Sequence, residues 1–228
     1  MFDKLPDEEE VSVVLAGPFE PGDFEPKKLV AQNILLPQEG RKAIPYRNIF
    51  SAGSGFKFDG ITLFVASRKL NLETHDTSRS DRLRDIVLGI LHHAKGTPNQ
   101  ACGINYEFFF SLPGEHAREQ LMLREAPVHQ YWSGVLEHPT VREVTVSGKR
   151  FGKFPGENNV TLRPWNRRGH GLGLIVAVNY HFPMPKDCAA DQLPELAAKF
   201  LEKEWSPALT FAQRAAKHVF AHGGNNAV

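Results

Sequence analysis

The segment from residue 149 to residue 168 combines positive charge with aromatic side chains in a pattern suited to nucleic acid. Lys and Arg side chains neutralise phosphates, and an exposed aromatic ring stacks on an unpaired base. These features predict a nucleic-acid surface made of Lys149, Arg150, Lys153, Arg163, Trp165, Arg167 and Arg168. The alternative is a solvated hairpin tip with Trp165 in the core, since no RNP, KH or helix-turn-helix signature accompanies the charge.

His75 is the second candidate for chemistry. It lies between Thr74 and Asp76, with Glu73 nearby, in the stretch LNLETHDTSRSD. An imidazole beside carboxylates at the end of a strand suits general acid and base work. The alternative is a polar loop that leads into a capped helix.

Metal and nucleophile motifs are weaker. His116 lacks the second histidine of zinc-binding helices, and His218 and His222, spaced i, i+4, suit the positive end of a helix. Cys102 and Cys188 form no CxxC pair, and neither a GxSxG nor a GxxxxGK[ST] motif occurs. We therefore expect no bound metal and no cofactor.

The glycines of RRGHGLGLIVAVNYHF introduce a strand. Large side chains occupy the even positions from Leu172 to Phe182, and this alternation is typical of a strand with one buried face. A phosphate-binding glycine loop follows a strand and opens a helix, whereas these glycines open a strand. We predict a strand over residues 171–182 with Leu172, Leu174, Val176 and Val178 on its more buried face.

Two segments predict the principal helices. Leu83, Ile86, Val87, Ile90 and Leu91 form an apolar stripe within a helix over about 81–94, with Ser78 and Asp81 as its cap and Gly96 as its stop. A second helix covers about 191–222, where Pro207 gives either a kink or a fresh start.

Further strands are predicted by alternation and by turn residues. They cover residues 11–15, 61–72, 104–110, 141–146 and 160–162, with a turn at 58–60 before the second. Clustered strands that give way to a helix favour an α+β fold with a mainly antiparallel sheet. We expect a single compact domain over residues 1–228. A weak internal similarity between two strand-loop-helix units offers the alternative of two similar halves, 1–96 and 101–228.

Composition indicates an ordinary folded protein. Of 228 residues, 41% are hydrophobic and 23% charged, and the formal net charge is +1. That charge gives no general preference for nucleic acid or membrane, and no apolar stretch reaches the ~20 residues that span a bilayer. With no secretory signal and two unpaired cysteines, we expect a cytoplasmic protein.

Phe109 indicates an interaction surface. If Tyr106, Phe108 and Phe110 face the core, Phe109 points to the other side and needs a second layer or a partner to cover it. Together with the missing catalytic motifs, this predicts a binding or assembly protein that recognises other polypeptides and self-associates. The alternatives are a nucleic-acid-binding protein and an enzyme with a site near His75.

The order of elements resembles the SecB-like chaperone group. The shared features are mainly antiparallel strands followed by a long, interrupted C-terminal helix, whereas the helix over 81–94 departs from the pattern. No motif matches, so the resemblance implies no site residue. It implies oligomerisation through sheet edges or helices and binding of other polypeptides.

Overall fold

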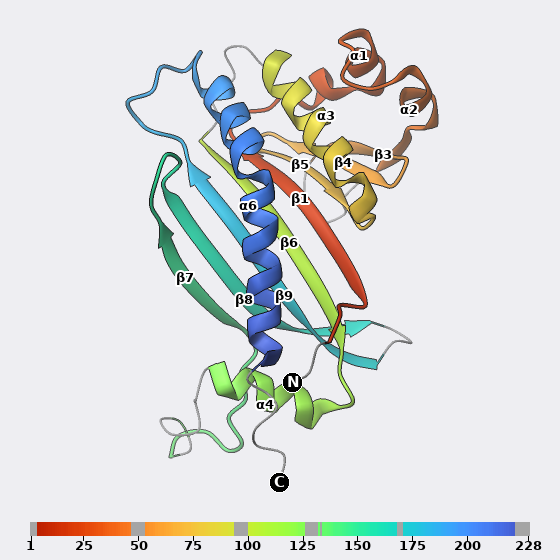
Figure 1. Ribbon diagram of the computed structural model, residues 1–228. Coiled ribbons are helices and arrows are strands. Elements are labelled where there is room, and N and C mark those ends of the chain that lie inside the picture. The colour runs from red at the N-terminus through yellow and green to blue at the C-terminus, as the bar shows by residue number, and fades with distance from the viewer. Residues whose placement is uncertain are drawn as a thin grey trace.

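One antiparallel sheet forms the centre of the molecule (Figure 1). The computed structural model describes residues 4–46, 53–93, 100–125, 132, 134–167 and 171–221. Its nine strands follow the order β2-β3-β4-β5-β1-β6-β9-β8-β7. The strands are β1 (Glu8–Ala16), β2 (Ile44–Tyr46), β3 (Ser54–Phe58), β4 (Ile61–Ala66), β5 (Lys69–Thr74), β6 (Ala101–Ser111), β7 (Val144–Arg150), β8 (Gly156–Arg167) and β9 (Gly171–Pro183).

The described helices gather on one face of this sheet, which we call the helix face. The long α6 lies lengthwise along β6 and β9, with α3 beside its upper part (Figure 1). The helices are α1 (Pro26–Ala31), α2 (Pro37–Lys42), α3 (Ser80–His93), α4 (Glu115–Glu125) and α6 (Leu193–Ala221), with short 3-10 turns at Pro21–Phe24 and Thr77–Arg79. The α+β prediction with two principal helices is confirmed.

The strand predicted over residues 171–182 is present as β9, and its period-two pattern is confirmed at Leu174, Val176 and Val178, whereas Leu172 is only half-buried and Ile175 on the other face is 7% exposed. Leu174 and Val176 are fully buried and Val178 is 1% exposed, whereas Ala177 and Asn179 on the opposite face are only half-buried. The large residues of β9 pack beneath α6, where the rings of Phe182 and Phe200 stack with centroids 4.8 Å apart. Alternation along the strand therefore separates a dry face from a more polar one.

The predicted single strand over 61–72 is wrong. The chain instead forms the hairpin of β4 and β5, in which Ala66 pairs with Lys69. The apolar residues continue on both sides of the turn, so their pattern does not mark where the chain reverses. Gly55 lies in β3, where Leu63 O would be 2.0 Å from an added Cβ atom. The turn at 58–60 is present, with positive φ at Asp59 and Gly60.

Two details of the principal helices differ from the expectation: the cap before α3 and the continuity of α6 at Pro207. The Asp76 side chain, rather than Ser78 with Asp81, caps the approach to α3 by accepting a hydrogen bond from Ser78 N. Pro207 lies inside a continuous 29-residue α6. Buried Trp205 and Ala208 on either side of it anchor both parts of the helix to the same core, so packing outweighs the lost backbone hydrogen bond. Helices α1, α2 and α4 were not predicted.

The chain has two halves with corresponding element order. In each half a first strand is followed by an antiparallel meander and a closing helix, with α1 and α2 before the four-strand meander of the first half and α4 before the three-strand meander of the second. The first strand pairs with the last strand of its own meander. The two first strands, β1 and β6, pair with each other at the centre. A single apolar core includes residues from both halves. Duplication of one ancestral unit stays a prediction.

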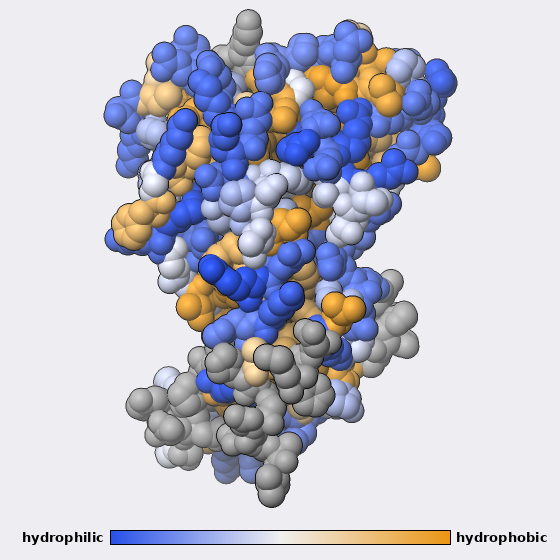
Figure 2. Space-filling view, viewed as in Figure 1, coloured by the Kyte–Doolittle hydropathy of each residue, from blue (hydrophilic) through white to orange (hydrophobic). Residues whose placement is uncertain are grey.

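The outer surface of the helix face is mostly hydrophilic (Figure 2). Charged residues such as Lys199 and Glu195 line the outside of α6, while Ala197, Leu201 and Ala208 face the sheet. None of the described helices combines the length and the apolar content needed to cross a membrane.

Candidate functional site

No described helix covers the opposite side of the sheet, which we call the open face. Its central feature is a row of polar side chains on neighbouring strands, in which Ser12 of β1 lies opposite Asn105 of β6, and Asn105 lies opposite Asn179 of β9. Asn105 Nδ2 donates to Ser12 Oγ at 3.3 Å, and Asn179 Nδ2 donates to Asn105 Oδ1. Amides and hydroxyls in such a row can donate to and accept from another chain or ligand.

Three carboxylates lie beside this row. Glu10 of β1 lies directly opposite Glu107 of β6, and Glu73 is the diagonal neighbour of Glu10 on β5. Like charges placed directly opposite each other destabilise a sheet. Arg163 of β8 offsets part of the repulsion, because its Nη2 donates to both oxygens of Glu107 at 2.7 Å. On the intervening strand β9, Glu107 lies opposite Ala177 and Arg163 lies opposite Ile175, so the arginine reaches Glu107 diagonally across β9.

The carboxyl group of Glu10 has a raised pKa in this arrangement. Burial raises its pKa from the ordinary value of 4.5 to about 7, and the charges of Glu107 and Glu73 act in the same direction, whereas Arg163 lowers it. A carboxyl with such a pKa exchanges its proton near neutral pH. Among the described residues, Arg163 pairs with Glu107, whereas Glu10 and Glu73 form no ion pair with a lysine or an arginine, although exposed Lys69 lines the same hollow.

His75 belongs to the same site. It follows β5, and its Nε2 lies 3.3 Å from Glu10 Oε2. Its ring also lies beside Phe109, with centroids 6.5 Å apart. The sequence prediction of a histidine near a carboxylate therefore identified a residue of this site, but the carboxylate comes from a strand more than 60 positions away rather than from Glu73 or Asp76.

Phe109 points to the open face, as predicted, but side chains of its own chain cover it. It is 8% exposed, and the half-buried Trp165 packs edge-on against it with centroids 5.3 Å apart. Gly173 lies beneath the indole, since an added Cβ would come within 2.6 Å of Trp165 Cε3. Trp165 thus packs on the open face against Phe109 instead of entering the main core. A role of Phe109 in binding a partner stays a prediction.

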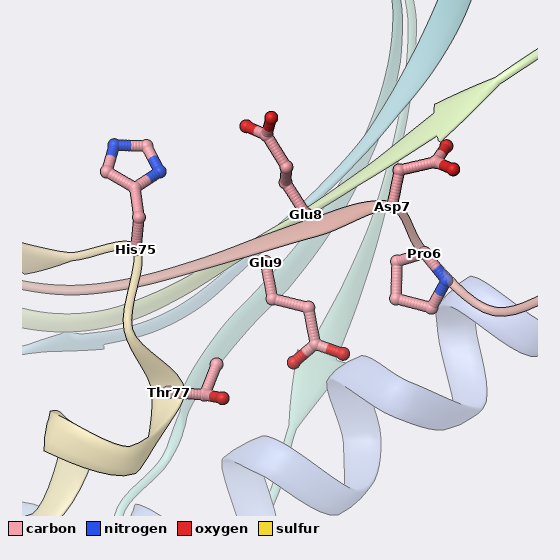
Figure 3. Close-up of a pocket in the computed structure, with 6 residues that line it drawn as sticks. All are labelled: Pro6, Asp7, Glu8, Glu9, His75 and Thr77. Carbon is pink, nitrogen blue, oxygen red and sulfur yellow. The ribbon is translucent and has the colours of Figure 1, made fainter.

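A shallow hollow lined by the acidic residues Asp7, Glu8 and Glu9 lies at the start of β1 (Figure 3). Glu8 and His75 point to one side of the strand, whereas Glu9 and Thr77 lie on the other (Figure 3). Burial also raises the pKa of Glu9. The hollow is open to solvent and continues the negative charge of the open face toward the end of the sheet.

The central hollow of the open face is wide and shallow. It has a volume of about 320 Å³ and extends from Lys69 and Glu73 on β5 to Thr161 on β8. Two buried polar atoms of this face have no hydrogen-bond partner among the described residues: Asn71 Oδ1 and Arg163 Nε. Binding pockets for small molecules usually enclose most of the ligand. This shape is better suited to a segment of another chain laid across the strands.

The predicted basic surface is divided between the two faces. Arg150 turns to the helix face, where it donates to Phe154 O, Asn158 Oδ1 and His181 O and lies 3.9 Å from the Tyr180 ring centroid. Arg163 is held by Glu107 on the open face. Lys149 and Lys153 are exposed. The Arg167 side chain and all of Arg168 lie outside the described residues, and nucleic-acid binding stays a prediction.

No group of three His, Cys, Asp or Glu side chains in the described part of the chain is arranged to hold a metal ion. Burial raises the pKa of the Cys102 thiol far above its ordinary value, so that thiol is poorly suited to nucleophilic attack. His222, the proposed partner of His218, lies outside the described residues.

Sequence reasoning missed most residues of the site, notably Glu10, Glu107, Asn105 and Asn179. A signal was present, because Glu10 and Ser12 alternate with buried Val11 and Val13 in β1. Alternation shows that these side chains share a face. It does not show that β1 and β6 are neighbours, and the site depends on that pairing.

Comparison with known proteins identifies no family. No family model matches the chain, and no curated protein matches it. A solved structure, the di-domain ARO/CYC StfQ from the steffimycin biosynthetic pathway, is 12% identical over 92% of this chain and 97% of that chain, with a TM-score of 0.24. At that TM-score the likeness carries no argument about fold or function. The resemblance to the SecB-like chaperone group stays a prediction.

Proposed function

We propose that this chain is a binding protein that takes a basic segment of another polypeptide onto the open face of its sheet. The observation that carries the proposal is the cluster of Glu10, Glu73 and Glu107, of which only Glu107 forms an ion pair with an arginine among the described residues, on a face that no described helix covers. A Lys or Arg side chain placed between these carboxylates would relieve their mutual repulsion.

The polar row supports a polypeptide as the ligand. Ser12, Asn105 and Asn179 offer donors and acceptors suited to the peptide groups of an extended chain. The hollow crosses several strands instead of closing around a compact molecule. Recognition then combines peptide hydrogen bonds with charge pairing, and the charge pairing supplies much of the specificity.

Calorimetric titration with short peptides tests this proposal. A mixed library of lysine-rich and arginine-rich peptides should bind, whereas matched peptides with glutamate at the same positions should not. Glu73→Gln combined with Glu107→Gln should weaken binding about tenfold or more at low salt. Glu195→Gln on the outer side of α6 is the matched control and should leave affinity unchanged. Equal affinity for basic and acidic peptides would refute the proposal.

A second function, acid and base catalysis, is favoured by one specific observation. Glu10 has a pKa of about 7 and lies 3.3 Å from His75 Nε2. A carboxyl with this pKa, within reach of an imidazole, can accept and return a proton near neutral pH. Turnover that is lost in both Glu10→Gln and His75→Gln, while basic peptides still bind, would favour this enzyme hypothesis. Loss of peptide binding without any turnover would favour the binding protein.

A further inference from the structure

The two edges of the sheet differ in how well they are protected. At one edge, β2 has three residues and contains Pro45, and both features hinder pairing with another strand. At the other edge, β7 has seven residues, contains no proline, and has exposed side chains from Thr145 to Lys149. A strand of this kind presents unpaired backbone N–H and C=O groups to solvent.

We infer that β7 pairs antiparallel with β7 of a second copy of this chain, so that the sheet continues across a two-fold axis. With the axis perpendicular to the sheet, α6 of both copies lies on the same side. Residues directly opposite each other in an antiparallel pair point to the same face. Only registers that pair odd positions with odd and even positions with even therefore satisfy the symmetry.

Charge selects one register among these. Glu143 immediately precedes β7 and Lys149 lies near its end, and both side chains are exposed. With Val146 opposite Val146 of the second copy, Glu143 lies opposite Lys149, and the symmetry makes this ion pair twice. The same register places Arg142 opposite Arg150, whose guanidinium is turned to Phe154 O, Asn158 Oδ1 and His181 O of its own chain. A shift by one allowed step in either direction places Thr145 opposite Lys149 or Ser147 opposite Glu143, and both ion pairs are lost.

The centre of the strand favours the same register. Val146 is 59% exposed in one copy and would contact its equivalent at the axis, which removes apolar surface from water. The residues from Val144 to Gly148 carry no charge, so no like charges meet near the axis. The segment lacks the inward charges and prolines that keep natural edge strands apart.

Sedimentation at low salt tests the dimer and its register by charge exchange. Wild-type protein should have twice the 25.5 kDa mass of one chain. Glu143→Lys and Lys149→Glu should each weaken the dimer about tenfold, because each puts like charges opposite one another twice. The double variant should restore the wild-type Kd. Lys153→Glu, an equal charge change outside the strand, is the control and should leave the Kd unchanged.

A cysteine placed on the axis supplies a second test. In a Cys188→Ser background, Val146→Cys should form an intermolecular disulfide under mild oxidation, because the two Cβ atoms would be about 5 Å apart. Ser147→Cys is the matched control, since its two copies would lie beyond the ~7 Å reach of a disulfide.

Three results would overturn the inference. One is wild-type protein that stays monomeric at its highest soluble concentration. Another is a dimer whose Kd responds to neither Glu143→Lys nor Lys149→Glu. The third is equal crosslinking of the Val146→Cys and Ser147→Cys variants. None of these results bears on peptide binding to the open face, so the two proposals fail independently.

Discussion

The two faces of the sheet are built from the same strands and have opposite chemistry. On the helix face, Phe182 and Phe200 stack in a dry core. On the open face, Glu10 and Glu107 lie opposite each other, and Arg163 forms its ion pair with Glu107. Because side chains alternate along a strand, one set of residues stabilises the fold while the intervening set is free to bind. Substitutions on the two faces should therefore have different consequences.

The largest expected effect is on the helix face. Phe200→Ala should lower the free energy of unfolding by about 3–5 kcal/mol, because it leaves a cavity among rings that are fully buried. Denaturant unfolding monitored by circular dichroism measures the change. Thr161→Ala on the open face, which loses only the hydroxyl contact with Thr145, should cost about 1 kcal/mol or less. A similar decrease in the free energy of unfolding for both variants would contradict the proposed difference between the two faces.

The next effect concerns the support of Trp165 on the open face. Gly173→Ala should destabilise the protein by about 1–3 kcal/mol, because the new Cβ would come within 2.6 Å of both Phe110 O and Trp165 Cε3. The emission of Trp165 should change as the indole moves. Gly114→Ala, where an added Cβ meets no atom within 4 Å, is the control. Equal stability of the two variants would show that the backbone yields without cost.

The pH dependence of stability follows from Glu10. Its pKa of about 7 exceeds the ordinary value of 4.5, so the folded protein binds more protons between these values. Stability from this group is present below pH 4.5 and is lost as the pH rises to about 7. Glu10→Gln should remove this slope and, with screening by solvent, stabilise the protein above pH 7 by about 1–2 kcal/mol.

Unfolding curves from pH 4 to 9 measure that slope. The titratable and charged groups that face Glu10 are His75, Glu73, Glu107 and Arg163. Glu195→Gln is the control, because Lys199 lowers the pKa of that exposed carboxyl and its effect has the opposite sign. If Glu10→Gln leaves the pH dependence of stability unchanged, the proton that the folded protein binds in this pH range belongs to another group.

The smallest expected effect is on the outside of α6. Lys199 forms an exposed i, i+4 ion pair with Glu195 at 2.6 Å. Lys199→Ala should change stability by less than about 0.5 kcal/mol, since such pairs are weak and alanine favours a helix. Chemical denaturation at low and high salt measures this small difference. A larger loss would mean that the lysine stem also covers apolar surface.

The sequence allowed prediction of which side chains share a face of each strand or helix. It gave less information about which other strands and side chains that face contacts. The alternation in β9 and the apolar stripe of α3 depend on neighbours a few residues apart, so both were predicted correctly. Trp165 covers Phe109, Glu10 meets His75, and Glu107 meets Arg163 because of the order of strands in the sheet. Alternation within a strand carries no information about that order. The site was therefore predicted only at His75, Phe109, Arg163 and Trp165, without their partners.

The central position of β1 determines the order in which the chain can fold. Val11 pairs with Thr74 on one side and with Tyr106 on the other, so its first partner is synthesised about 60 residues later, several seconds at usual rates of translation. The meanders β3-β4-β5 and β7-β8-β9 pair through short connections and can close early. Docking of β1 beside β6 then joins two preformed sheets, and this long-range step is expected to limit the folding rate.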